Sequence, residues 1–236
     1  MTEVEASAVI AAIRTGDVGT LARLLRDTPG LATERVTRAD GFAYPLLHAT
    51  TDWPGNFPRV AESIALLVAA GADVEARCAG ANAETALHFA ASCDDVAAVD
   101  ALVVAGADIE TEGAVIAGGT PLDDAVAFAQ WKAARRLVDL GAITAVWHAA
   151  ALGLVDRIEA WFASGQPASR HPWGATADRR DIDVALWCAA HGGQRAAAEL
   201  LLARGANPAW RSPWDRLTPI EAARRSGAAD LVTLLT

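Results

Sequence analysis

The chain has 236 residues, of which 53% have apolar and 21% have charged side chains. That length suits one domain or two small ones, and the apolar content is enough for a core, which excludes a disordered chain. The longest apolar stretch, IALLVAAGA at 64–72, is far shorter than the roughly 20 residues that cross a bilayer. No membrane partner is therefore expected.

The net charge is −9, from 20 basic and 29 acidic residues. Nucleic acids are bound mainly by neutralising their phosphates, so an acidic chain without a basic stripe is not expected to bind them. The start MTEVEAS has no basic segment followed by an apolar one, and a cytoplasmic location is expected. Lys132 is the one lysine among many arginines and alanines, a composition that indicates a GC-rich, bacterial source.

A glycine followed by alanine ends one apolar run after another. The phrases are GADVEA at 71, GADIET at 106, GAITA at 141 and GANPA at 205, with Gly165 in the same role. The first two intervals, Gly71 to Gly106 and Gly106 to Gly141, are both 35 residues. Glycine adopts the left-handed conformation that ends many helices, so each phrase predicts the end of a helix.

A second phrase recurs upstream of these glycines. It reads YPLLHAT at 44, TALHFAA at 85, TPLDDAV at 120, TAVWHAA at 144, VALWCAA at 184 and TPIEAAR at 218. Threonine caps exposed helix amides and proline is tolerated at the first helical position, so Thr-Pro predicts a helix start. Each repeat is therefore expected to contain a short helix, a turn, a longer helix and a loop.

These phrases resemble the ankyrin-repeat family, whose unit of about 33 residues begins T-P-L-H-x-A. TALHFAA is the nearest match, with Ala86 in place of proline, whereas Asp123 and Glu221 stand where the family has histidine. The resemblance covers about residues 4–235. It implies an all-α fold, an ankyrin-repeat solenoid of six to seven helix-turn-helix units with short hairpin-like loops.

The repeats predict a single ankyrin-repeat domain over residues 1–236. Its expected parts are an N-terminal cap (1–35), a second repeat (36–77) with an insertion (50–58), a third (78–112), a fourth (113–143), a fifth with a shortened link (144–165), a long loop (166–183), a sixth repeat (184–210) and a C-terminal cap (211–236).

Two departures from the period suggest binding regions, because loops over rigid scaffolds often carry function. The long loop 166–183 follows a shortened link, so it either fills the gap or frames a pocket for a ligand or partner. The insertion TTDWPGNFP at 50–58 contains Trp53 and Phe57. Its aromatic residues either contact a partner, at little entropic cost, or fold back over a helix end.

Tryptophan is over-represented, with eight residues against one tyrosine. Counting back from the glycines places Trp147 and Trp187 at the position of His88, and Trp173 lies in the long loop. One interpretation is an aromatic wall that binds a small apolar or aromatic ligand. The other is that these rings fill space between irregular repeats.

The same count places five residues at one inward-leaning position: His48, Phe89, Asp124, His148 and Cys188. Asp124, His148 and Cys188 suggest an acid, a base and a nucleophile. Equivalent positions on packed helices lie about 8–10 Å apart, however, beyond the roughly 2.6–3.2 Å contact that activation requires. We therefore expect a buried polar network and no catalytic residues. Nucleotide-binding and metalloprotease motifs are absent and metal ligands are not clustered, so no cofactor or metal is expected.

The predicted concave groove has a small, apolar floor that includes Ser92, Phe128 and Leu152. Asp52 lies toward one end, and the other end contains three groups that carry or can gain positive charge: His191, Arg195 and Arg225. Such a groove favours an apolar segment with an acidic end, and His191 could make binding sensitive to pH.

The resemblance therefore predicts a non-enzymatic module that binds another protein through its concave groove and loop tips. The alternative is a small-molecule binding protein or an atypical enzyme. It would use the aromatic and histidine side chains of the C-terminal half.

Overall fold

The computed structural model describes residues 3–38, 41–79, 83–116, 118–165 and 180–236. The chain divides into two compact units, an N-terminal unit of residues 1–142 and a C-terminal unit of residues 143–236. In the described residues both units consist almost entirely of paired helices.

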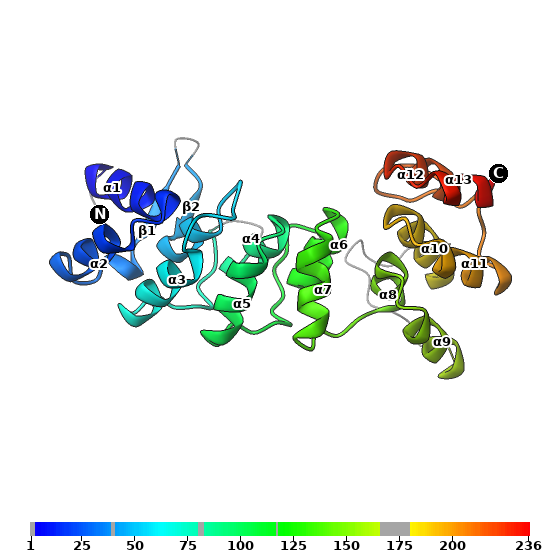
Figure 1. Cartoon of the computed structure of the whole chain (residues 1–236), viewed down its shortest axis with the longest axis horizontal. Coiled ribbons are helices and arrows are strands. Elements are labelled where there is room, and N and C mark those ends of the chain that lie inside the picture. The colour runs from blue at the N-terminus through cyan, green and yellow to red at the C-terminus, as the bar shows by residue number, and fades with distance from the viewer. Residues whose placement is uncertain (1–2, 39–40, 80–82, 117, 166–179) are drawn as a thin grey trace. The chain divides into compact units, whose positions relative to one another are not determined.

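The N-terminal unit contains four of these pairs, and its second helices α3, α5 and α7 lie side by side (Figure 1). Its helices are α1 (Glu3–Thr15), α2 (Val18–Asp27), α3 (Val60–Ala69), α4 (Ala86–Ser92), α5 (Val96–Val104), α6 (Pro121–Ala127) and α7 (Trp131–Asp139), with the 3₁₀ helices η1 (Leu31–Thr33) and η2 (Leu46–Thr50). Two short strands, β1 (Arg35–Thr37) and β2 (Ala43–Pro45), pair antiparallel with Val36 opposite Tyr44.

The described residues of the C-terminal unit form three helix pairs. They are α8 (Val146–Leu152) with α9 (Val155–Ala163), α10 (Asp181–His191) with α11 (Arg195–Ala203), and α12 (Pro219–Arg225) with α13 (Ala229–Leu235). In this unit α10 packs against both α8 and α12.

The recurring phrases start and end helices as predicted. Thr120 and Thr218 cap α6 and α12, and their own backbone N–H groups donate to the side chains of Asp123 and Glu221. At the other end, Gly71 has a φ of 99°, and Ala72 donates a backbone hydrogen bond to Leu67. These local bonds satisfy backbone groups that a helix end leaves open.

The second repeat departs from the expected helix pair, because its first helix is the 3₁₀ segment η2. Two threonine side chains cap the C-terminal end of η2. The hydroxyl of Thr50 donates to the Leu47 carbonyl at 2.7 Å, and that of Thr51 donates to the His48 carbonyl at 3.2 Å. Such local bonds compete with the backbone bonds of a longer helix. The inserted loop therefore begins directly after η2.

Candidate functional site

The inserted loop is attached to the neighbouring repeat. The Asn56 backbone N–H donates to Asp95 Oδ2 at 2.6 Å, and the Asn56 side-chain amide donates to the Cys93 carbonyl at 3.0 Å. Gly55 lies so close to this turn that a Cβ atom would come within 2.7 Å of Cys93 Cβ. The loop is thus held against the turn that follows α4.

An edge of the N-terminal unit combines this loop with the turns that follow α4 and α6. We call it the turn edge and define it as residues 51–59, 92–95 and 127–130. Asp94 continues the edge, because its carboxylate accepts the Ala133 N–H of α7 at 2.8 Å. Trp53 is 78% exposed and Phe128 is 43% exposed on this edge, whereas Ser92 and Phe57 are half-buried.

Asp52 is paired inside the unit. Its buried carboxylate contacts Arg14 Nη2 at 3.4 Å and also forms an ion pair with Arg38. Arg14 lies over the Phe57 ring at 5.9 Å, and Arg38 lies over Tyr44 at 5.3 Å. The carboxylate therefore anchors the start of the inserted loop and is already neutralised by two guanidinium groups.

Replacing Asp52 with asparagine is expected to lower the free energy of unfolding by about 1–2 kcal/mol, because two charge-assisted contacts are lost. Both arginines are about half exposed and can be hydrated, which keeps the loss below that of a fully buried pair. Urea unfolding followed by circular dichroism measures it. Asp27→Asn is the matched control, since Asp27 is exposed and contacts Arg23 at 3.6 Å. Equal losses in the two variants would contradict the anchoring role.

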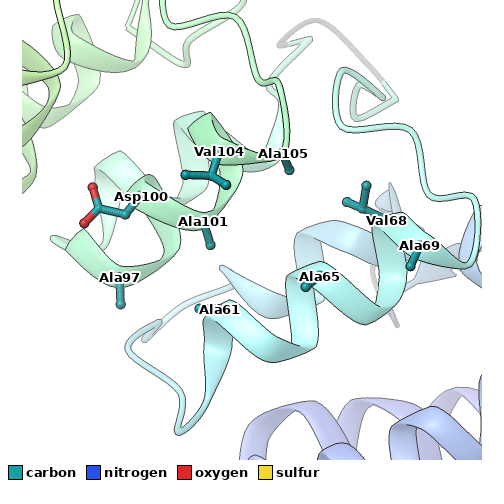
Figure 2. A pocket seen from close by; sticks show the side chains of 9 residues that line it. All are labelled: Ala61, Ala65, Val68, Ala69, Ala97, Asp100, Ala101, Val104 and Ala105. Carbon is teal, nitrogen blue, oxygen red and sulfur yellow. The ribbon is translucent and has the colours of Figure 1, made fainter.

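A groove runs between the outer faces of α3 and α5 (Figure 2). It has a volume of about 710 Å³. Apart from Asp100, which pairs with Arg136 of α7, its lining is alanine and valine: Ala61, Ala65, Val68, Ala69, Ala97, Ala101, Val104 and Ala105. Val104 is 88% exposed. Sequence reasoning missed this groove, although VAESIALLVA and VAAVDALVV lack the polar face expected of a surface helix.

In the C-terminal unit, aromatic rings gather around Trp187 of α10. The ring of His191 stacks on it at 5.2 Å, Trp214 meets it edge-on at 4.9 Å, and the Arg225 guanidinium lies over it at 5.4 Å. Trp187 is 4% exposed and its Nε1 atom has no hydrogen-bond partner. We call these four residues the aromatic cluster.

Arg225 is held in place by Asp215 at 2.7 Å. Burial opposes ionisation of Asp215, but hydrogen bonds from Ser212, the Leu217 N–H and Arg225 hold its pKa below the ordinary value. The positive charge of Arg225 is therefore balanced within the unit.

Comparisons with known proteins identify the repeat. The family model for the ankyrin repeat matches residues 82–113. The chain is also similar in structure to the human ASB11 ankyrin repeat domain, with a TM-score of 0.55 and 18% sequence identity, covering 97% of each chain. Residues 82–113 thus form an ankyrin repeat, and the chain has the ankyrin-repeat fold. No curated protein matches its sequence. The predicted resemblance to the ankyrin-repeat family and the predicted fold class are confirmed.

In the fifth repeat the residue equivalent to His88 is His148, one position later than the count back from the glycines predicted. His88 accepts the Thr85 N–H at 3.1 Å, and His148 accepts the Ala145 N–H at 3.0 Å in the same way. The alignment placed Trp147 opposite His88 and was wrong, because α8 reaches its turn at Gly153 one residue earlier. Trp147 thus occupies the buried position of Leu87.

The other predicted site residues vary in exposure. Trp147 has no exposed surface, and His148 and Leu152 are 4% and 2% exposed. Arg195 donates to Glu199 at 2.8 Å and to the Asp230 carbonyl at 2.7 Å. Trp173 and most of the predicted 166–183 loop lie outside the described residues.

The predicted acid, base and nucleophile are divided between the two units. Asp124 belongs to the N-terminal unit, whereas His148 and Cys188 belong to the C-terminal unit. Burial raises the pKa of the Cys188 thiol, and it raises that of Cys78 to about 12, so both stay protonated and weakly nucleophilic. Within the described part of the chain, acidic, histidine and cysteine side chains form no cluster that could hold a metal.

The described helices include none that is long and apolar enough to cross a membrane.

Proposed function

We propose that this chain is a non-enzymatic module that binds another protein through the turn edge of its N-terminal unit. The ankyrin-repeat fold is generally a protein–protein interaction module. The observation that carries the proposal is Trp53, whose side chain is 78% exposed on a loop held by Asn56 and Gly55. A large aromatic ring on a held loop loses little entropy on binding.

The alternative, a pocket for a small ligand in the C-terminal half, has less support. Trp147 and His148 are core residues with almost no accessible surface. Trp187 is itself 4% exposed, and its ring already contacts Arg225 and His191. A ligand would have to displace these contacts before reaching the ring.

Trp53→Ala is expected to weaken partner binding by about 10- to 30-fold, because exposed tryptophans that become buried often contribute about 2 kcal/mol. The full chain would first be used for affinity capture from the lysate of its source organism, with retained proteins and small molecules both analysed. Titration of the purified retained protein against each variant then gives the dissociation constants.

Phe128→Ala tests the second exposed ring of the turn edge, and Val104→Ala is the control on the α3–α5 groove. The proposal requires that capture retains one protein in stoichiometric amount. The Val104→Ala variant should bind this protein as the wild type does, and the Trp53→Ala variant should bind it weakly. Unchanged binding by Trp53→Ala with loss in Val104→Ala would move the interface to the α3–α5 groove. A retained metabolite, released by a Trp187 variant, would instead favour the small-ligand alternative.

A further inference from the structure

Two arginines of the N-terminal unit share the single carboxylate of Asp52. Arg14 Nη2 contacts one carboxylate oxygen, Oδ2, at 3.4 Å, and Arg38 Nη2 donates to the other oxygen, Oδ1. Among the ion pairs of the described residues, each other acid pairs with a single arginine. The three side chains therefore carry one net positive charge, in a chain whose net charge is −9.

Both guanidinium groups have N–H donors that face solvent. A guanidinium carries five N–H donors in a planar fork, and Asp52 contacts one nitrogen, Nη2, of each arginine. The side chains of Arg14 and Arg38 are 48% and 42% exposed, whereas that of Asp52 is 7% exposed. A ligand arriving from solvent therefore meets the two guanidinium groups and not the carboxylate between them.

Aromatic rings restrain both guanidinium groups. Arg14 lies over the Phe57 ring at 5.9 Å, and Arg38 lies over the rings of Phe42 and Tyr44 at 5.5 Å and 5.3 Å. Cation–π contacts of this kind, together with the shared carboxylate, hold the donors in place before a ligand arrives. Less side-chain entropy is then lost on binding.

We propose that Arg14 and Arg38 form a binding site for a carboxylate, and that the protein partner supplies this group as an aspartate or glutamate side chain. The inference rests on the proposed function and names the chemistry of the partner. Trp53 directly follows Asp52 in the chain, so the charged site adjoins the exposed ring of the turn edge. A second carboxylate would complete a set of two guanidinium and two carboxylate groups with no net charge.

A carboxylate matches the charge of this site better than a phosphate group does. A phosphate monoester carries about −1.5 to −2 charges at neutral pH, which exceeds the one positive charge left by the cluster. Its extra charge would also be repelled by Asp52. Asp52 alone would disfavour an acidic partner, and the two arginines reverse that preference.

Titration of the full wild-type chain with sodium acetate tests the site directly. Nuclear magnetic resonance of the arginine Nε–H groups follows binding, and sodium chloride at equal ionic strength is the reference. We expect saturable shifts at Arg14 and Arg38 with acetate only. Arg23, which is 57% exposed and contacts Asp27 at 3.6 Å, should not shift. Equal shifts with both salts, or equal shifts at Arg23, would overturn the site.

Variants separate the charge of the site from its role in folding. Arg38→Gln should weaken acetate binding about tenfold, whereas Arg23→Gln, which removes the same charge elsewhere, should bind as the wild type does. Asp52→Asn should bind acetate about fivefold more tightly, because it removes a nearby negative charge, even though it lowers stability. Weaker acetate binding by Asp52→Asn would overturn the charge argument. If Arg38→Gln does not fold, Arg14→Gln replaces it.

Binding of the protein retained by affinity capture distinguishes this inference from the proposed function. Arg38→Gln should weaken its binding about tenfold, and Arg23→Gln should leave it unchanged. Weak binding by Trp53→Ala with unchanged binding by Arg38→Gln would overturn the acidic partner and leave the proposed function standing. Unchanged binding by Trp53→Ala with weak binding by Arg38→Gln would support the carboxylate site and reject Trp53 as the main contact.

Discussion

Trp147→Ala is expected to lower the free energy of unfolding of the C-terminal unit by about 3–5 kcal/mol. The ring has no exposed surface, and truncating a fully buried aromatic side chain loses its transfer free energy and leaves a cavity. Urea unfolding of the full chain measures the loss, and hydrogen exchange shows whether it falls on residues 143–236.

Trp53→Ala is the matched control, because it removes the same side chain from a position that is 78% exposed. Its expected effect on stability is below about 0.5 kcal/mol, as for most surface substitutions. A small loss of unfolding free energy in Trp147→Ala would contradict the core position of Trp147 and favour the predicted aromatic wall. A large loss in Trp53→Ala would mean that the inserted loop serves stability.

Gly192→Ala is expected to destabilise the C-terminal unit by about 3 kcal/mol through steric overlap. Gly192 ends α10, and an added Cβ would come within 2.8 Å of the Ala151 carbonyl carbon on α8 and nearer still to its oxygen. Its φ of −83° is ordinary for any residue. The penalty would therefore come from the close packing of α8 on α10, and thermal or urea unfolding would measure it.

Gly19→Ala separates this overlap from a general glycine effect. Gly19 lies in the first turn of α2, and an added Cβ would have its nearest contact at 3.5 Å, with Asp17 Oδ1. Alanine is the better helix former, so this variant should gain about 0.5 kcal/mol. Similar losses in Gly192→Ala and Gly19→Ala would refute the close approach of α8 and α10.

Much of the fold could be predicted because the signals are local. Gly71 and Gly106 end helices through backbone conformation, and Thr120 and Thr218 start helices through side-chain bonds to nearby amides. Repetition of these signals predicts the ankyrin fold, which a single phrase would indicate only weakly. The exposure of Trp53 also agrees with a loop rich in proline and glycine.

The candidate sites depended on contacts between segments far apart in the sequence. Asp52 was expected toward one end of the groove, but Arg14 and Arg38 reach it from 38 and 14 residues away and pair with it. His148 looked like the counterpart of Phe89, but a turn one residue earlier at Gly153 makes it the capping histidine. Counting along the chain cannot detect either change.

The sequence by itself determined the repeat, several helix starts and ends, and the class of fold, because capping, turn conformation and hydrophobic period act within a few residues. Only the tertiary structure decided which polar groups are left without partners. The burial of Asp124 and Trp147 and the apolar groove between α3 and α5 all arise where one repeat packs on the next. Their energies depend on burial and neighbouring charge, which local sequence does not specify.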